Sequence, residues 1–257
     1  MAGKRIDATL ICGGKYHDFD FARLELLKLL GEHERIRTRV GSDFSDTGAI
    51  LGSDLLITYT CDVVPSAAEQ AALQEFLRKG GRWFALHATD SIISWISMDP
   101  PLVGTPRSAP LFMQMMGNQF LAHPPIEPYE VHVSDPSHPL VAGIEPFTTT
   151  DELYLMEHHG AIEPLLHCHY NGTVKEFEHS DWRNDERRLV MYLHPYEGGE
   201  VLYFTLGHCR GRYDMQPLLE EWPQVDRCSW ELPVYYELLR RGIAWAARLT
   251  PKAPHAA

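Results

Sequence analysis

Residues 66–87, SAAEQAALQEFLRKGGRWFALH, decide the fold that we predict for this chain. Ser66 and Glu69 have the spacing of a capping box, which marks the first turn of a helix. Apolar residues then recur at helical spacing until Gly80-Gly81, where a glycine stop ends the helix. The largely apolar residues 82–86 follow at once and predict a buried strand. A helix that leads directly into a strand is typical of α/β proteins.

The same alternation of strand and helix runs from the start of the chain to this stretch. Residues 8–12 and 55–59 predict short buried strands, and apolar residues at helical spacing predict a helix over residues 21–30 between them. This order predicts a parallel sheet with right-handed crossovers. Further along, residues 188–193 and 200–205 flank a glycine-containing turn and predict a hairpin.

Between about residues 92 and 117 the pattern breaks down into a stretch rich in Pro, Met, Ser and Gly. We predict a long loop there, and a loop of this length inside a compact domain usually forms a lid or a wall of a site. The charged residues 179–188 predict a surface excursion. Because no internal repeat or low-complexity tract interrupts the chain, we predict a single domain over residues 1–257.

The composition excludes several classes of partner. A formal net charge of −12 argues against binding to nucleic acid or to an anionic membrane surface, since both attract basic patches. No stretch reaches the roughly 18 apolar residues of a membrane-spanning helix, and the N-terminal residues lack the apolar region of a signal peptide. Five scattered cysteines form neither a disulfide framework nor a paired metal motif. We therefore expect a cytoplasmic protein with a small, neutral substrate.

Three of the predicted strands lead into a histidine at their carboxyl end, namely His17, His87 and His208. In open α/β sheets the functional crevice lies beyond the carboxyl ends of the strands. We therefore expect these three side chains to converge on one pocket, although they are far apart in the chain. Imidazole titrates near neutral pH and is the commonest metal ligand in proteins. The arrangement predicts a metal site or an acid–base site.

Two more residues are candidates for the same site. His123 precedes Pro124-Pro125, which holds the backbone extended and fixes the direction of the imidazole. Glu152 lies beside apolar residues, where it could act as a general base with a raised pKa or as a metal ligand. The alternative for Glu152 is an exposed glutamate at the start of a strand, since carboxylates are mostly exposed.

Two aspartates have a local alternative to a role in the site. Asp18 could act in the site or could cap a helix that begins near Asp20. Asp90 could orient His87 as its carboxylate partner, or it could cap a helix that begins at Ser91. The sequence leaves both alternatives open.

Short segments from about residue 10 to residue 248 follow the order of one known family. They are 13–19 (GGKYHDF), 80–91 (GGRWFALHATDS), 120–124 (FLAHP), 135–139 (DPSHP), 151–154 (DELY), 205–208 (TLGH) and 241–247 (RGIAWAA). Together they resemble the ThuA-like family, which is named for trehalose utilisation and is related in fold to class I glutamine amidotransferases. The resemblance implies a flavodoxin-like, doubly wound and mostly parallel sheet with helices on both faces, and a place in carbohydrate metabolism. Residues 179–188 and 209–233 look longer than the family pattern leads us to expect.

The relation to amidotransferases sharpens one point. Those enzymes carry a cysteine nucleophile at the turn between a strand and the following helix, whereas this chain has Leu86-His87-Ala88 there. His208 matches the histidine that ends a later strand in those enzymes. Without a thiol at the turn, acyl transfer from glutamine loses its nucleophile, so we do not expect an amidotransferase.

In view of the resemblance, we expect an enzyme that acts on a sugar or a 3-keto-glycoside. A ketone at C3 acidifies the C2 hydrogen, and a base can remove that proton while a divalent metal ion, such as zinc or manganese, polarises the carbonyl. The aglycone then leaves by elimination. Addition of water completes a net hydrolysis, whereas reprotonation on the other face gives an isomerisation.

The candidate residues divide into three groups for this chemistry. The expected metal ligands are His17, His123 and His208. The expected catalytic residues are His87, Glu152, Asp90 and Asp18. Aromatic rings can stack on sugar faces, and we expect this role for Trp95 and Tyr154, with Trp222 as a further aromatic residue in a loop.

The alternative is a non-catalytic sugar-binding protein that assists a sugar oxidoreductase. A binding module needs aromatic and amide side chains, but it does not need several histidines at strand ends. The density of titratable groups therefore favours the enzyme. The sequence specifies neither the sugar nor the oligomeric state, and a homo-oligomer is among the options.

Overall fold

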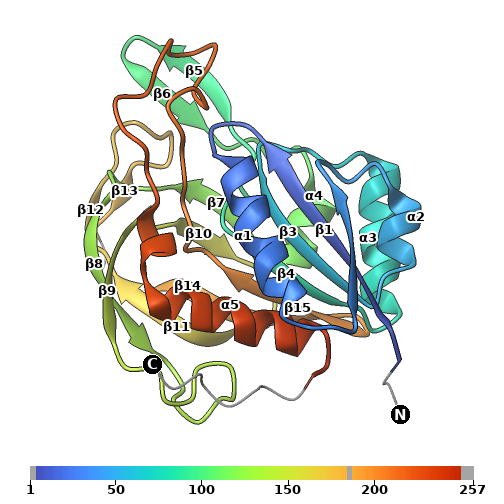
Figure 1. The fold of residues 1–257 in the computed structure, drawn as a ribbon. Helices are drawn as coiled ribbons and strands as arrows, with labels where there is room; N and C mark the ends of the chain where they lie inside the picture. The colour runs from blue at the N-terminus through green and yellow to red at the C-terminus, as the bar shows by residue number, and fades with distance from the viewer. Residues whose placement is uncertain (1–3, 184–186, 250–257) are drawn as a thin grey trace.

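The computed structural model describes residues 4–183 and 187–249. Within these residues the main feature is a nine-stranded sheet with strand order β2-β1-β3-β4-β15-β14-β11-β8-β9 (Figure 1). Its strands are β1 (Ile6–Gly14), β2 (Ile36–Gly41), β3 (Leu55–Cys61), β4 (Arg82–Leu86), β8 (Glu127–Val133), β9 (Phe147–Asp151), β11 (Glu163–His169), β14 (Arg187–Tyr196) and β15 (Gly199–Phe204).

The first part of this sheet is parallel and the second part is antiparallel. Neighbours from β2 to β15 pair in parallel, whereas neighbours from β15 to β9 pair antiparallel. The parallel sheet predicted for residues 8–86 is therefore confirmed, and so is the hairpin, which β14 and β15 form. The flavodoxin-like α/β class holds, with an antiparallel extension along one edge.

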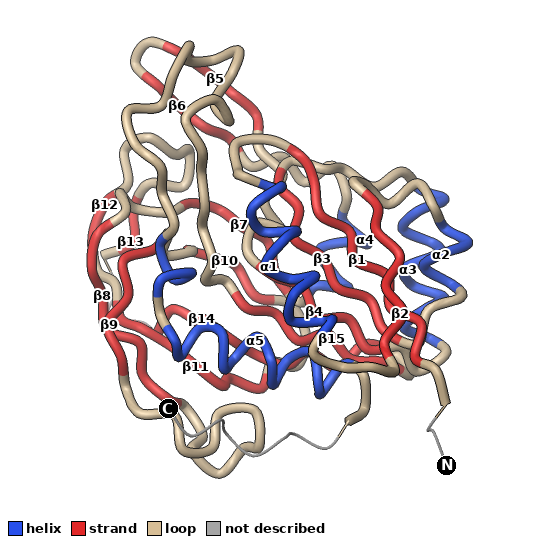
Figure 2. Tube along the Cα trace, in the orientation of Figure 1, coloured by secondary structure: helices blue, strands red, loops and turns tan. Residues whose placement is uncertain are grey.

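Helices cover both faces of the parallel part (Figures 1 and 2). One face carries α1 (Phe19–Gly31) and α5 (Pro233–Ala246), and the other carries α2 (Thr47–Leu51), α3 (Ala67–Arg78) and α4 (Pro110–Met116). The predicted capping box is present at the start of α3, where the side chains of Ser66 and Glu69 each accept a hydrogen bond from the other residue's backbone N–H.

The region around residues 92–117 is not the loop that we predicted. It holds a hairpin of β5 (Ser94–Met98) and β6 (Pro101–Gly104), followed by α4. β5 and β6 are too short to show a clear alternation of apolar and polar residues. Almost all residues of α4 are apolar, so its sequence shows no helical spacing of apolar residues. The predicted excursion at 179–188 includes residues 184–186, which lie outside the described residues. The remaining short elements are β7 (Asn118–Ala122), β10 (Leu155–His158), β12 (Gly172–Thr173), β13 (Asp181–Trp182) and the 3-10 helix η1 (Cys228–Glu231).

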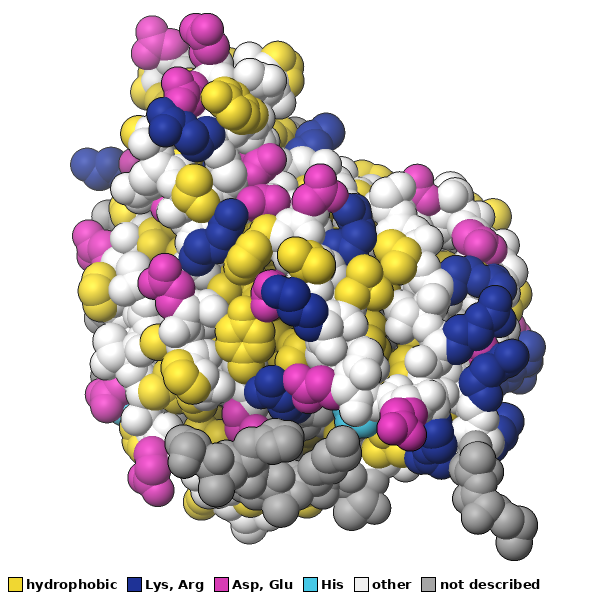
Figure 3. All heavy atoms as spheres, viewed as in Figure 1, with side chains coloured by type: hydrophobic (Ala, Val, Ile, Leu, Met, Phe, Trp, Pro, Cys, Tyr) yellow, Lys and Arg dark blue, Asp and Glu magenta, His cyan; other side chains and the backbone are white. Residues whose placement is uncertain are grey.

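The surface of the described residues carries charges of both signs. On the face seen in Figure 3, acidic and basic side chains are interspersed among apolar ones. No described helix is long and apolar enough to cross a membrane. All five cysteines are free thiols, which agrees with the expected lack of a disulfide framework.

Candidate metal centre

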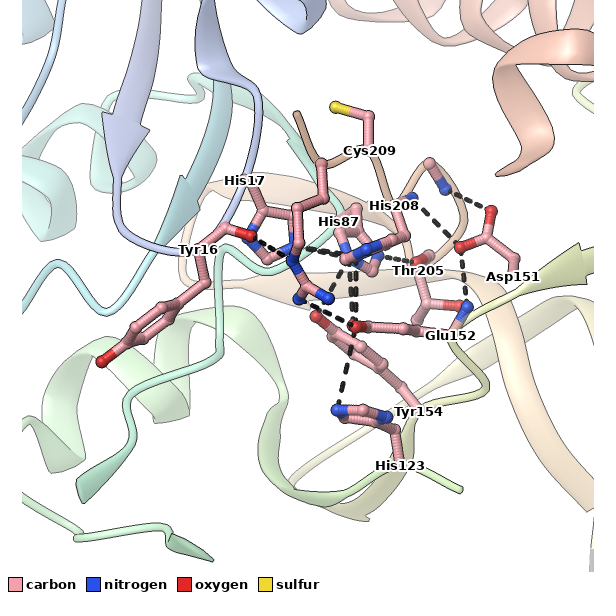
Figure 4. Close-up of polar contacts among 12 residues, drawn as sticks. Tyr16, His17, His87, His123, Asp151, Glu152, Tyr154, Thr205, His208 and Cys209 are labelled. Carbon is pink, nitrogen blue, oxygen red and sulfur yellow. Dashed lines mark hydrogen bonds and ion pairs between the residues drawn. The ribbon is translucent and has the colours of Figure 1, made fainter. Parts of the chain in front are cut away.

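Three histidines and one glutamate meet beyond the carboxyl ends of the central strands (Figure 4). Nε2 of His17 lies 3.1 Å from Nε2 of His87 and 3.2 Å from Nδ1 of His208. The carboxylate of Glu152 lies 3.4 Å from His87 Nε2 and 3.1 Å from His208 Nδ1. All four side chains are buried, and one donor atom from each lies within 4.8 Å of the others. The predicted convergence of the three histidines is confirmed, and we call these four residues the cluster.

The three histidines follow parallel strands, as predicted, whereas Glu152 follows an antiparallel strand. His87 follows β4 directly, His208 follows β15, and His17 lies on the turn after β1, so all three extend beyond parallel strands. Glu152 comes from the end of β9, at the antiparallel edge of the sheet. Three strands separate β9 from β15 in the sheet order, so this edge curls back to bring Glu152 to the cluster.

The buried carboxylate of Asp151 holds the end of β9 against the segment after β15. One of its carboxylate oxygens accepts hydrogen bonds from the N–H groups of Glu152 (2.8 Å) and His208 (3.0 Å). The other accepts from Gly207 (2.8 Å) and Ser229 (3.2 Å). These bonds join the end of β9 to the segment after β15. Asp151 therefore positions two cluster residues at once, a role that the sequence analysis missed.

Hydrogen-bond partners assign the tautomers of two histidines. Nδ1 of His17 lies 3.1 Å from the carbonyl oxygen of Lys15, and Nδ1 of His87 lies 2.5 Å from that of Thr205. A carbonyl oxygen only accepts hydrogen bonds, so each Nδ1 carries a proton and each Nε2 presents a lone pair when the ring is neutral. Two lone pairs 3.1 Å apart repel each other. The cluster therefore calls for a positive charge between them, which a proton or a metal ion can supply.

Burial and neighbouring charges set the protonation of the cluster. Burial lowers the pKa of His17 to about 3 and the pKa of His208 well below its usual range. Burial opposes the ionisation of Glu152, but the surrounding histidines outweigh it and hold the pKa of this carboxyl well below its usual range. Burial likewise opposes a charge on His87, and the Glu152 carboxylate nevertheless raises its pKa. The cluster thus contains an ionised carboxylate, two neutral imidazoles and one imidazole that can hold a proton.

This donor set fits a divalent metal ion. Imidazole nitrogens and carboxylate oxygens are common zinc ligands, and a metal requires its ligands to be deprotonated. Bonds of about 2.0–2.2 Å to one ion place its ligand atoms roughly 3–4 Å apart. In the cluster, four distances between donor atoms are 3.1–3.4 Å, and one donor atom from each residue lies within 4.8 Å of the others. Other first-row divalent ions accept the same donors, so the cluster could hold any of several metals.

Two side chains border the cluster without belonging to it. Nε2 of His123 lies 3.8 Å from the Glu152 carboxylate, and its Nδ1 lies 2.9 Å from the carbonyl oxygen of Pro124. We expected His123 among the metal ligands, but the structure groups His87 and Glu152 with His17 and His208 instead. The hydroxyl of Tyr154 is 3.3 Å from His87 Nε2, and this tyrosine is buried. Tyr154 therefore contacts the cluster itself.

A pocket of about 810 Å³ opens beside the cluster. Glu152 and His123 line it together with Arg210, Trp222 and Asp226. The last three belong to residues 209–233, the stretch that looked unusually long in the sequence. The volume is typical of a site for a small molecule. A ligand in this pocket can therefore contact Glu152 and His123.

Two other expected site residues have local partners. Asp18 caps α1 by accepting a hydrogen bond from the N–H of Phe21, and its carboxylate pairs with Arg227 at 2.8 Å. This is the capping alternative that the sequence left open. Trp95 lies in β5, where its Nε1 donates to the hydroxyl of Tyr16 at 3.2 Å. Neither residue is part of the cluster.

Asp90 takes neither of its two expected roles. No helix begins at Ser91, and the partner of His87 Nδ1 is the carbonyl oxygen of Thr205. Asp90 is fully buried and accepts a hydrogen bond from the hydroxyl of Tyr203. Burial raises the pKa of Asp90 from 3.8 to about 7.

We predict that Asp90→Asn makes the free energy of unfolding less dependent on pH. The folded state holds the Asp90 proton more tightly than the unfolded state does. The stabilisation from this group is therefore complete below about pH 4 and is lost as the pH rises through about 7. The loss is at most on the order of 4 kcal/mol. Denaturant unfolding of wild type and variant at pH values from about 5 to 8 measures it.

The control for this prediction is Asp54→Asn, which makes the same change at an exposed carboxylate. It should change the free energy of unfolding by less than about 1 kcal/mol. If Asp90→Asn showed the same pH dependence as the wild type, Asp90 would not hold a proton in the folded state at neutral pH.

Comparison with known proteins identifies the family. The sequence model of the ThuA family, described as trehalose utilisation, matches residues 9–221. This range contains all four cluster residues. The chain therefore belongs to the ThuA family, and the resemblance noted in the sequence is confirmed. No curated protein matches the chain.

Solved structures share the fold. A ThuA-like protein from Parabacteroides merdae has a TM-score of 0.68 at 18% identity, covering 98% of this chain and 94% of its own. A ThuA-like protein from Bacteroides uniformis has a TM-score of 0.65 at 17% identity, covering 96% and 93%. A beta-galactosidase from Rahnella sp. R3 has a TM-score of 0.55 at 11% identity, covering 96% of this chain and 32% of its own. At these identities the likeness establishes the fold alone.

Proposed function

We propose that this protein is an enzyme of carbohydrate metabolism that binds a divalent metal ion through the cluster and acts on a 3-keto-glycoside. The observation that carries the proposal is the pair of facing Nε2 atoms in His17 and His87 beside the ionised Glu152, because this buried arrangement calls for a cation. The family description, trehalose utilisation, supports a sugar as the substrate. The pocket beside the cluster offers room for one.

His123 is the residue best placed to act as the base. The carbonyl oxygen of Pro124 engages its Nδ1 proton, so the lone pair is on Nε2. The side chain lines the pocket and is 28% exposed, so a substrate can reach it. A bound divalent ion would polarise the C3 carbonyl. His123 then takes the C2 proton, the electron pair forms a C1=C2 double bond, and the C1–O bond to the aglycone breaks.

A chromogenic 3-keto-glycoside tests this proposal. The metal-loaded protein should release nitrophenol from nitrophenyl 3-keto-glucoside but not from the matching 3-hydroxy glucoside, because only the ketone acidifies the C2 hydrogen. Equal release from both compounds, or none from either, would contradict the proposed reaction. Sugar binding without turnover would instead support a non-catalytic sugar-binding protein that assists a sugar oxidoreductase.

We expect His123→Gln to lower kcat at least about 100-fold, as the loss of a general base does. Glutamine is polar but cannot take up the C2 proton. Metal content and melting temperature should remain close to wild type, since His123 lies outside the cluster. Steady-state kinetics and elemental analysis measure the two effects. His132→Gln, at a half-exposed histidine of β8, is the control. Loss of the metal from His123→Gln would show instead that His123 is a ligand.

A further inference from the structure

A guanidinium lies between the pocket and the cluster. Arg210 lines the pocket, and its side chain is only 10% exposed. Its Nη2 lies 3.9 Å from the carboxylate of Glu152, and its Nε donates to the carbonyl oxygen of Tyr16 at 2.9 Å. Figure 4 shows the Glu152 carboxylate between the cluster histidines and His123. Arg210 follows His208 by two residues in the chain, but no pattern in the sequence indicated a role for it.

Neighbouring residues hold this side chain in one orientation. The backbone of Arg210 pairs in both directions with that of Asp226. The guanidinium carbon lies 4.6 Å from the ring centroid of Trp222, and Trp222 Nε1 donates to the Asp226 carboxylate at 2.9 Å. Among the described residues, no hydrogen bond engages Nη1 of Arg210. The guanidinium is therefore oriented by its surroundings and still has N–H groups to donate.

A purely structural role does not explain why the side chain of Arg210 lies beside the cluster. The guanidinium of Arg210 is positively charged and lies beside the cluster, so it also opposes any cation there. A distance of 3.9 Å is long for an ion pair with Glu152. A fixed cation beside a cation site becomes favourable when an anionic oxygen binds near both. The pocket is the place where such an oxygen can enter.

We propose that Arg210 is a catalytic residue that donates a hydrogen bond to the substrate oxygen on which negative charge develops. This rests on the proposed function: as the C2 proton leaves for His123, the electron pair spreads toward the carbonyl oxygen before the aglycone departs. Arg210 keeps its own protons, because guanidinium is not deprotonated in proteins. Its N–H groups stabilise the charge from a fixed position, as oxyanion-binding groups do. The ligand class that Arg210 recognises is an oxyanion, such as an enolate or a carboxylate.

The test uses zinc-loaded protein and two independent measurements. One is the affinity for oxalate by calorimetry, a carboxylate probe that requires no turnover. The other is kcat and KM for the 3-keto-glycoside. We expect Arg210→Met to weaken oxalate binding at least about tenfold and to lower kcat about 100-fold or more, with a smaller change in KM and an unchanged zinc content. Arg210→Lys keeps the charge but loses the planar fork, so it should fall in between.

Arg188 provides the matched control. It is also a buried arginine that donates to a backbone carbonyl, that of Tyr170, and lies over a tryptophan ring, that of Trp182. Arg188→Met should reduce stability while leaving oxalate affinity and kcat unchanged. If Arg210→Met behaved in the same way, Arg210 would be structural and the proposal would be overturned. A further outcome is that the wild type turns over no 3-keto-glycoside while it binds oxalate more tightly than Arg210→Met does. That result would support anion binding by Arg210 and would contradict the proposed reaction.

Discussion

Removal of the proposed divalent metal ion is expected to abolish turnover and to destabilise the protein. Without a cation, Nε2 of His17 and Nε2 of His87 face each other at 3.1 Å in a buried site. Carbonyl polarisation by a metal is worth several kcal/mol, so kcat should fall by about a thousandfold or more. A metal at about 100 times its dissociation constant stabilises the folded state by about 2.7 kcal/mol, so the melting temperature should also fall. Chelation followed by metal add-back, with kinetics and thermal unfolding, measures both effects.

Single substitutions separate the metal from the fold. His208→Ala should lose the bound metal and the activity together. His194→Ala is the control, because His194 is a buried histidine whose nitrogens lie within hydrogen-bond distance of the carbonyl oxygens of Ala161 and Gln114. It should lose stability but keep its metal. Full activity in metal-free protein would contradict the metal site. The positive charge of the cluster would then be a proton on His87, and acid–base catalysis by the histidines would replace the metal.

The positions of the cluster histidines could be predicted from the sequence because each histidine follows a strand of the parallel part of the sheet. His87 and His208 follow β4 and β15, which are parallel neighbours, and His17 lies after β1 in the same parallel part. The carboxyl ends of such strands share one edge of the sheet. Strand ends can be read from short apolar runs and the residues that stop them. The convergence of these side chains therefore follows from the strand order in the chain.

The positions of Glu152 and Arg210 relative to the cluster could not be predicted in this way. Glu152 reaches the cluster because the antiparallel edge curls back, and that curl depends on hydrogen bonds from the N–H groups of Gly207 and His208 to the distant Asp151. No periodicity in a sequence encodes a contact of this kind. Arg210 belongs to a segment without regular structure, in which its direction depends on Trp222 and Asp226. The long segment after His208 was visible in the sequence, but the orientation of its side chains was not.

Asp151 is also expected to stabilise the fold. We expect Asp151→Asn to lower the free energy of unfolding by about 3 kcal/mol or more. Each carboxylate oxygen of Asp151 accepts hydrogen bonds from two backbone N–H groups. An amide replaces one oxygen by an NH₂ group, which cannot accept. Two N–H groups then lose their partner, and an unsatisfied buried group costs about 1–3 kcal/mol. For a chain of this size the melting temperature should fall by roughly 6–12 °C, which calorimetry or circular dichroism can measure.

Asp43→Asn is the matched control, because Asp43 also accepts a hydrogen bond from a backbone N–H, that of Ser45, but is exposed. Water can satisfy that N–H, so Asp43→Asn should change stability by less than about 1 kcal/mol. Asp151→Asn should also weaken metal binding, since the same carboxylate fixes the backbone of Glu152 and of His208. Wild-type stability in Asp151→Asn would show that the curl of the antiparallel edge is secured elsewhere, and that Asp151 does not position the cluster.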